Sequence, residues 1–133
     1  MKRTVLILLI MVALISACGA STASLTGATW TVTSLSGVNV DPTVPMTGTF
    51  GTDGKLTGSG GCNNYTANYT ASGSNLTIDS PSSTMMTCTE VVNQQESEYL
   101  YLLENSSTYN IKGSTLTIKD STGQAIIEYT SGS

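Results

Sequence analysis

Two short segments, each with one cysteine, constrain this 133-residue chain more than any other feature. Residues 58–65 have the sequence Gly-Ser-Gly-Gly-Cys-Asn-Asn-Tyr, and residues 84–88 have the sequence Thr-Met-Met-Thr-Cys. Glycine admits positive φ and a close backbone approach, and asparagine tolerates left-handed conformations. The first segment therefore predicts a rigid corner that carries the thiol of Cys62, although a plain glycine-rich turn would use the same residues.

The two cysteines of these segments favour a disulfide between Cys62 and Cys88. The chain has no histidine, and zinc sites usually take four nitrogen or sulfur ligands, so a metal site is the weaker reading. On the chain-entropy model such a bridge stabilises a small domain by about 3–4 kcal/mol. Two separate buried thiols, or a reactive thiol at Cys88 near a helix N-terminus, are alternatives that the residues leave open.

The first 17 residues have the layout of a secretory signal, with basic Lys2-Arg3 followed by an apolar run over residues 5–14 that is too short to span a membrane. Ile15-Ser16-Ala17-Cys18 resembles the lipobox of bacterial lipoproteins, which implies that Cys18 carries the lipid. Ordinary signal cleavage, with Cys18 incidental, is the alternative. Residues 18–24 would then be the lipidated cysteine and a flexible tether. We expect an exported protein anchored to the cell membrane or the outer membrane by lipid on Cys18.

The charge of the remaining chain limits its partners. Lys55, Lys112 and Lys119 stand against nine acidic side chains, a net charge of about −6. Such a domain is a poor candidate for binding nucleic acid, because neutralisation of phosphates supplies most of that affinity. Without histidine, the usual catalytic triads and metal sites lack a central residue. We therefore expect no enzymatic activity, no cofactor and no metal, and a monomer whose partners are the membrane and an envelope protein.

Short apolar–polar alternations broken by Gly, Asp and Asn run through residues 25–130 and predict seven or eight strands. The candidate strands cover residues 29–33, 46–50, 55–57, 65–69, 76–78, 109–111, 116–118 and 127–129. Asp53-Gly54 is a hairpin-turn signal between two of them.

Residues 91–103 change to helical periodicity, with Tyr99 and Leu103 on the apolar side and Glu96 largely on the other side. The predicted fold is mostly β, of the α+β class. It is a compact antiparallel sheet or partly closed barrel of seven to eight strands, with one amphipathic helix packed on it.

The order of these features resembles the META domain, the heat-shock-related HslJ-like family. The resemblance covers residues 25–130, which leaves residues 131–133 as a C-terminal tail. The matching motif residues are Gly61, Cys62, Asn63, Tyr69, Thr84, Met86, Cys88 and Glu96. The resemblance implies a compact β-rich domain with one helix, and the family has no agreed enzymatic activity.

Two functions are compatible with these observations. The first is a membrane-anchored envelope lipoprotein whose META/HslJ-like domain is a non-enzymatic interaction or stress-protective module. The second is a carrier or pilot-type lipoprotein that binds an acyl chain or an amphipathic peptide in an apolar cavity beneath Tyr99 and Leu103. We expect Met86 to point inward and fill a gap in the core.

Overall fold

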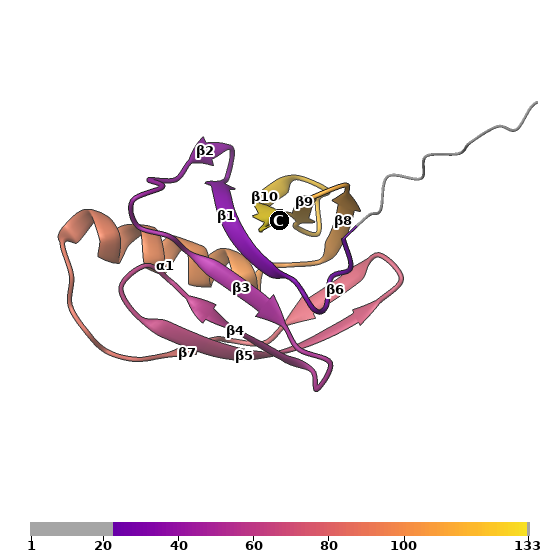
Figure 1. The fold of residues 1–133 in the computed structure, drawn as a ribbon, viewed down its shortest axis with the longest axis horizontal. Helices are drawn as coiled ribbons and strands as arrows, with labels where there is room; N and C mark the ends of the chain where they lie inside the picture. Colours follow the sequence, from indigo (N-terminus) through magenta and orange to yellow (C-terminus); the bar gives the residue numbers. More distant parts are fainter. Residues whose placement is uncertain (1–22, 133) are drawn as a thin grey trace, which may run out of the picture.

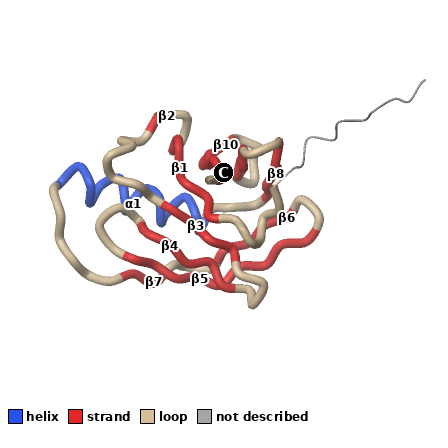
Figure 2. Tube along the Cα trace, in the orientation of Figure 1, coloured by secondary structure: helices blue, strands red, loops and turns tan. Residues whose placement is uncertain are grey.

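A computed structural model describes residues 23–132 of the chain, which form a mostly β domain with ten strands and one helix (Figures 1 and 2). The predicted signal peptide and the predicted lipidation site Cys18 lie outside these residues. The elements in chain order are β1 (Thr29–Leu35), β2 (Val38–Asn39), β3 (Thr47–Phe50), β4 (Lys55–Ser59), β5 (Asn64–Ser72), β6 (Asn75–Ile78), β7 (Ser82–Ser83), α1 (Glu90–Glu104), β8 (Thr108–Lys112), β9 (Thr115–Lys119) and β10 (Ala125–Ser131).

Eight of the strands close into an antiparallel barrel. Their order is β1-β3-β4-β5-β6-β8-β9-β10, and β10 returns to pair with β1 from Trp30↔Ser131 to Leu35↔Ile127. The narrowest joint lies between β6 and β8, where Asn75 and Thr108 are the only paired residues. The predicted fold class is confirmed, and each predicted strand is a strand of the barrel. Of the described strands, only β2 and β7, which have two residues each, were not predicted.

Local sequence explains why these strands form. In β1 and β4, apolar residues that face the interior alternate with threonines and other residues that face outward, as a half-buried strand requires. The predicted turn at Asp53-Gly54 joins β3 to β4: Gly54 has φ +80°, and Lys55 N donates to Asp53 Oδ1 over 3.1 Å. Glycine is favoured in this left-handed conformation because it has no Cβ.

The antiparallel register places the loops at two opposite ends of the barrel. At the first end, the Ala23 pole, Ala23 N donates to Gly113 O over 3.2 Å. The β3–β4, β5–β6 and β8–β9 turns and the end of β10 lie at this pole. At the other end, the helix pole, lie the β1–β2 hairpin, the β4–β5 turn, the β9–β10 turn and α1.

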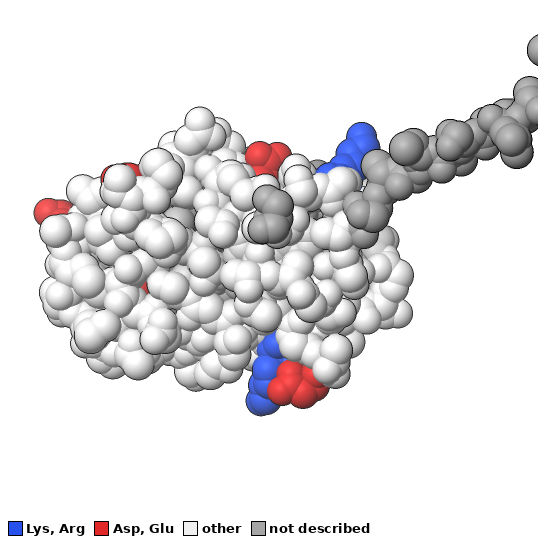
Figure 3. All heavy atoms as spheres, viewed as in Figure 1, with Lys and Arg blue, Asp and Glu red and all other residues white. Residues whose placement is uncertain are grey.

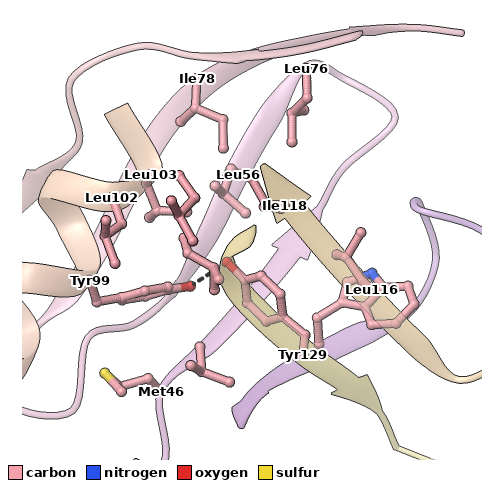
Figure 4. Close-up of a cluster of buried hydrophobic side chains, with 14 of the residues drawn as sticks. Met46, Leu56, Leu76, Ile78, Tyr99, Leu102, Leu103, Leu116, Ile118 and Tyr129 are labelled. Atoms are coloured by element: carbon pink, nitrogen blue, oxygen red, sulfur yellow. Dashed lines mark hydrogen bonds between the residues drawn. The ribbon is translucent and has the colours of Figure 1, made fainter. Parts of the chain in front are cut away.

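The helix lies across the helix pole, where it contacts β10, β1 and β6 (Figure 1). Its buried side chains are Glu96, Tyr99, Leu102 and Leu103, which recur at helical spacing on one face. The apolar members of this face enter the barrel interior and pack among strand residues such as Leu56 and Ile118 (Figure 4). Within residues 23–132, no helix is long and apolar enough to cross a membrane.

Three tyrosines meet inside the barrel. Tyr99 of α1 lies with its hydroxyl 2.8 Å from that of Tyr65 on β5 and 3.1 Å from that of Tyr129 on β10. Tyr65 also donates to the backbone carbonyl of Thr47 over 2.9 Å. The ring pairs are edge-to-face, with centroids 5.6 and 6.3 Å apart. The three hydroxyls thus satisfy one another and a strand carbonyl at the centre of an apolar core.

The Thr47 carbonyl also explains one glycine of the cysteine segment. A Cβ on Gly58 would clash with that carbonyl, so β3 and β4 can approach this closely only at a glycine. The tyrosine hydroxyls reach the carbonyl because no side chain intervenes.

The buried tyrosines predict that the domain unfolds in alkali. Burial raises the pKa of Tyr65, Tyr99 and Tyr129, since it disfavours the phenolate. An unfolded tyrosine ionises near pH 10, so their contribution to stability is complete below about pH 10 and is lost as the pH rises above it. We expect absorbance at 295 nm to show these three ionising together with the loss of far-UV circular dichroism. Ionisation of all six tyrosines of the chain before any change in dichroism would contradict this prediction.

Candidate functional site

Most of the motif residues meet in one polar cluster at the helix pole, which we call the cysteine corner. It joins the β4–β5 turn, residues 84–88 and the first half of α1. The turn is closed by Gly60 N, which donates to Asn63 O over 2.7 Å. Gly61 has φ +105°, and a Cβ on Gly60 would lie 2.6 Å from Glu96 Oε2. The turn therefore needs glycine at position 61 for its backbone conformation and at position 60 because a side chain would collide with Glu96.

A disulfide joins the turn to the segment that precedes the helix. Cys62 and Cys88 are bonded, with their Cα atoms 5.9 Å apart and a sequence separation of 26. The distance lies within the range that a disulfide spans. Separate thiols and a reactive Cys88 thiol, the alternatives left open by the sequence, do not occur in this structure.

Asn63 is the hub of the cysteine corner. Its Oδ1 accepts hydrogen bonds from Thr84 Oγ1 over 2.8 Å and from Met86 N over 2.7 Å. Its Nδ2 donates to Met86 O over 3.1 Å and to Glu96 Oε1 over 2.6 Å. An asparagine side chain has two donor and two acceptor positions, and here each of the four is used.

Glu96 connects the helix to this hub through a buried carboxylate. Its Oε2 accepts from Asn63 N over 2.6 Å and from Cys62 N over 3.1 Å, while its Oε1 accepts from Asn63 Nδ2. Only 7% of Glu96 is exposed. The expectation that it lies largely on the polar side of the helix was wrong, because these three donors replace the water that a carboxylate otherwise needs.

The remaining motif residues lie elsewhere or play other parts. Tyr69, half-buried on β5, donates to Gly51 O over 2.6 Å and packs edge-to-face on Phe50, away from the corner. Met86 is 63% exposed, so the inward methionine expected from the sequence is not found; only its backbone takes part in the corner. Cys18 is outside the described residues.

Tyr99 and Leu103, the candidate groove residues, are both completely buried in the barrel core (Figure 4). Both side chains fill the interior and do not line a surface groove. A carrier that used the space beneath them would therefore have to open the packed core first.

The chemistry of the cysteine corner is that of a structural clamp. Both carboxylate oxygens of Glu96 are engaged by N–H groups, and its nearest polar partner, Asn63, does not titrate. Among residues 23–132 there is no group of three or more His, Cys, Asp or Glu side chains that could hold a metal ion. The arrangement holds three segments together.

Surface hollows of the helix pole contain the residues that the sequence analysis missed. One, of about 560 Å³, adjoins Cys88 and the polar side chains Asn93 and Ser97. Another, of about 360 Å³, lies between the β1–β2 hairpin and α1 and includes Val38 and Val91. The two-residue turn at Ser36-Gly37 was the sequence signal that could have revealed the hairpin.

Comparison with known proteins identifies the domain at the level of family and fold. The META domain family profile matches residues 23–131. No curated protein matches the chain. A protein from Burkholderia xenovorans solved by NMR is 19% identical, with a TM-score of 0.67 over 82% of this chain and 84% of its own. A second NMR structure is 21% identical, with a TM-score of 0.61 over 77% of this chain and 87% of its own.

A DUF4847 family protein from Bacteroides vulgatus, known from a crystal structure, is also similar. It is 20% identical, with a TM-score of 0.53 over 64% of this chain and 57% of its own. At these identities the likeness to the three structures shows the fold alone. Neither the family match nor these structures indicate an enzymatic family.

The hydrogen bonds of the cysteine corner predict a compensating pair of substitutions. Glu96→Gln places an NH2 group against Asn63 Nδ2, and Asn63→Asp places a carboxylate oxygen against Glu96 Oε1. We expect each single variant to lose about 1–3 kcal/mol of unfolding free energy. In the double variant Gln donates to Asp, so its loss should fall below the sum of the two by about 1 kcal/mol or more.

Urea unfolding of the four proteins measures this coupling. Glu98→Gln, a change of an exposed residue on the same helix, is the matched control and should have little effect. Strictly additive losses would show that the two side chains do not act on each other.

The disulfide makes a separate prediction about stability. Reduction, or replacement of Cys62 and Cys88 by serine, should lower the unfolding free energy by about 3–4 kcal/mol, because the unfolded chain loses a closed loop. The barrel should keep its far-UV circular dichroism, since Asn63 still holds residues 84–86. Intact mass spectrometry before and after reduction shows whether the disulfide is present. An unchanged denaturation midpoint on reduction would contradict the prediction.

Proposed function

The chain belongs to the META domain family, and from this membership, its N-terminal sequence and its clamped surface we propose that it is a non-enzymatic envelope lipoprotein, anchored through Cys18 and acting as an interaction or stress-protective module. The META domain match covers residues 23–131 of this protein. The cell membrane or outer membrane holds the anchor.

One observation carries the non-enzymatic part of the proposal: the polar groups of the motif residues in the cysteine corner hydrogen-bond to one another. Asn63 uses all four of its hydrogen-bonding positions, and Glu96 accepts three hydrogen bonds. A catalytic acid or base needs a side chain free to meet its substrate. Because the motif side chains are already hydrogen-bonded within the domain, the proposal treats the domain as a scaffold whose outer surface contacts partners.

The disulfide and the position of Ala23 support export and anchoring. Structural disulfides persist in oxidising compartments and are rare in the cytosol. Ala23 lies beside Gly113 at the Ala23 pole, so the chain that precedes it reaches the domain at the end opposite α1. A lipid on Cys18 would thus place the helix pole away from the membrane, where partners have access.

The anchor is tested in a bacterium that makes the full chain and is fed an alkyne-tagged fatty acid. We expect the tag on the wild-type protein, which should be found in the membrane fraction, and no tag on Cys18→Ser. Cys88→Ser, the matched control, should still be tagged because its lipobox-like sequence is intact.

In the native host, a strain that lacks the protein should survive heat or envelope stress less well, and complementation should require Cys18. Label on Cys18→Ser, or a wild-type protein found untagged among soluble periplasmic proteins, would refute the anchor. Full complementation by Cys18→Ser would show that the protective role does not require the lipid anchor.

A further inference from the structure

A groove at the helix pole has apolar walls and acidic edges. It lies between the β1–β2 hairpin and α1 and has a volume of about 360 Å³. Its lining consists of the apolar side chains of Leu35, Val38, Val40 and Val91, the carboxylates of Asp41 and Glu98, and the amides of Asn39, Gln94 and Gln95. None of these residues belongs to the cysteine corner, so the clamp leaves the groove free.

The geometry of the hairpin explains why apolar side chains face this groove. Ser36 and Gly37 both have positive φ, of 48° and 80°, which gives a tight two-residue turn and fixes the register Leu35↔Val38. Directly paired residues of an antiparallel ladder lie on the same face. Val38 therefore shares the inward face of Leu35, but it projects past the rim of the barrel and remains 69% exposed.

Val91 forms the opposite wall. It lies in the first turn of α1 and is 70% exposed, although its neighbour Val92 is half-buried near Gly61. Exposed large apolar side chains are few in this domain, and two of them line one groove from two different elements. Such a convergence is typical of a surface that buries its apolar groups against a partner.

The charges around the groove have one sign. Asp41 and Glu98 line it, and Glu90 lies in the adjoining hollow, which shares Gln94 with the groove. Asp41 Oδ1 accepts from Thr43 N and Thr43 Oγ1 over 2.8 and 2.7 Å, and these bonds lower the pKa of Asp41. The carboxylate thus stays ionised over the whole physiological pH range.

No lysine of the described residues lines the groove. Lys55 and Lys112 lie at the Ala23 pole, and Lys119 ends β9, two strands away from β1 in the barrel. In the face shown in Figure 3, the acidic groups on the left side, which α1 occupies in Figure 1, have no basic group beside them, whereas the acidic groups at the top and the bottom lie closer to the basic ones. A ligand that fits the groove is apolar where it meets the valines and cationic at its edges.

We propose that this groove docks a peptide segment of a partner protein in which apolar side chains lie beside lysines or arginines. Val38 and Val91 are the anchors, and Asp41 and Glu98 select the cationic flanks. The inference rests on the proposed interaction function and names the partner's chemistry. The groove faces away from the Ala23 pole, so it stays open to other proteins when the chain is anchored.

The test uses the lipoprotein in zwitterionic nanodiscs and a fluorescent peptide of about 14 residues. Leucines and lysines are spaced along the peptide so that they fall on different faces of a helix. We expect saturable binding above that of empty nanodiscs, and at least a tenfold weaker Kd for the double variant Val38→Ser, Val91→Ser. Glu98→Gln should weaken binding several-fold. The affinity should fall as salt is raised, since the flanking charges are exposed.

Matched controls separate the groove from the rest of the surface. Met85→Ser removes another exposed apolar side chain, 93% exposed and outside the groove, and Glu104→Gln removes a charge from the same helix. Both should bind as the wild type does. A peptide with glutamate in place of lysine should not bind.

The proposal would be overturned by no binding above empty nanodiscs, by equal loss in the control variants, or by equal binding of the glutamate peptide. A dimer that is lost in the Val38→Ser, Val91→Ser variant, seen by analytical ultracentrifugation, would assign the groove to a second copy of this chain and would overturn it too. None of these outcomes changes the fatty-acid labelling of Cys18, so failure of the groove and failure of the anchor are distinguishable.

Discussion

The buried contact between Glu96 and Asn63 is the interaction on which the rest of the structure depends. A carboxylate withdrawn from water is costly unless donors replace the water, and here two backbone N–H groups and one side-chain amide do so. These donors exist only when the β4–β5 turn is formed, and the turn in turn positions the disulfide and residues 84–86. The contact therefore fixes where α1 begins its path across the barrel, and it places Tyr99 over the interior.

The strands and the helix could be predicted because their signals are local. Eight period-two segments became the eight barrel strands, and helical spacing gave α1 to within one residue at each end. Closure of the barrel could not be derived from local patterns, because it depends on pairing between β1 and β10, which lie near opposite ends of the domain sequence. The strands β2 and β7 were missed because two residues give no periodicity.

The burial of Glu96 shows where hydropathy misleads. Glu96, Tyr99 and Leu103 have the spacing of one helical face, yet the charge of Glu96 argued for the opposite side. The partners that make its burial favourable come from residues 62 and 63, more than thirty positions earlier. Met86 gave the reverse error: an apolar side chain suggested the core, but the structure uses its backbone. In both cases hydrogen bonding outweighed side-chain polarity, which no single-sequence pattern can weigh.

Closure of the sheet affects how neighbouring copies of the protein can associate. An open sheet leaves a row of backbone N–H and C=O groups that can template a strand of a neighbouring molecule. Here the eight main strands use most of those groups among themselves, the exception being the joint between β6 and β8, where a single residue pair connects the two strands. The strands outside the ring have only two residues each. Neighbouring copies held at high density on a surface would therefore find unpaired strand backbone mainly beside this joint, and closure of the rest of the sheet limits fibrous self-association.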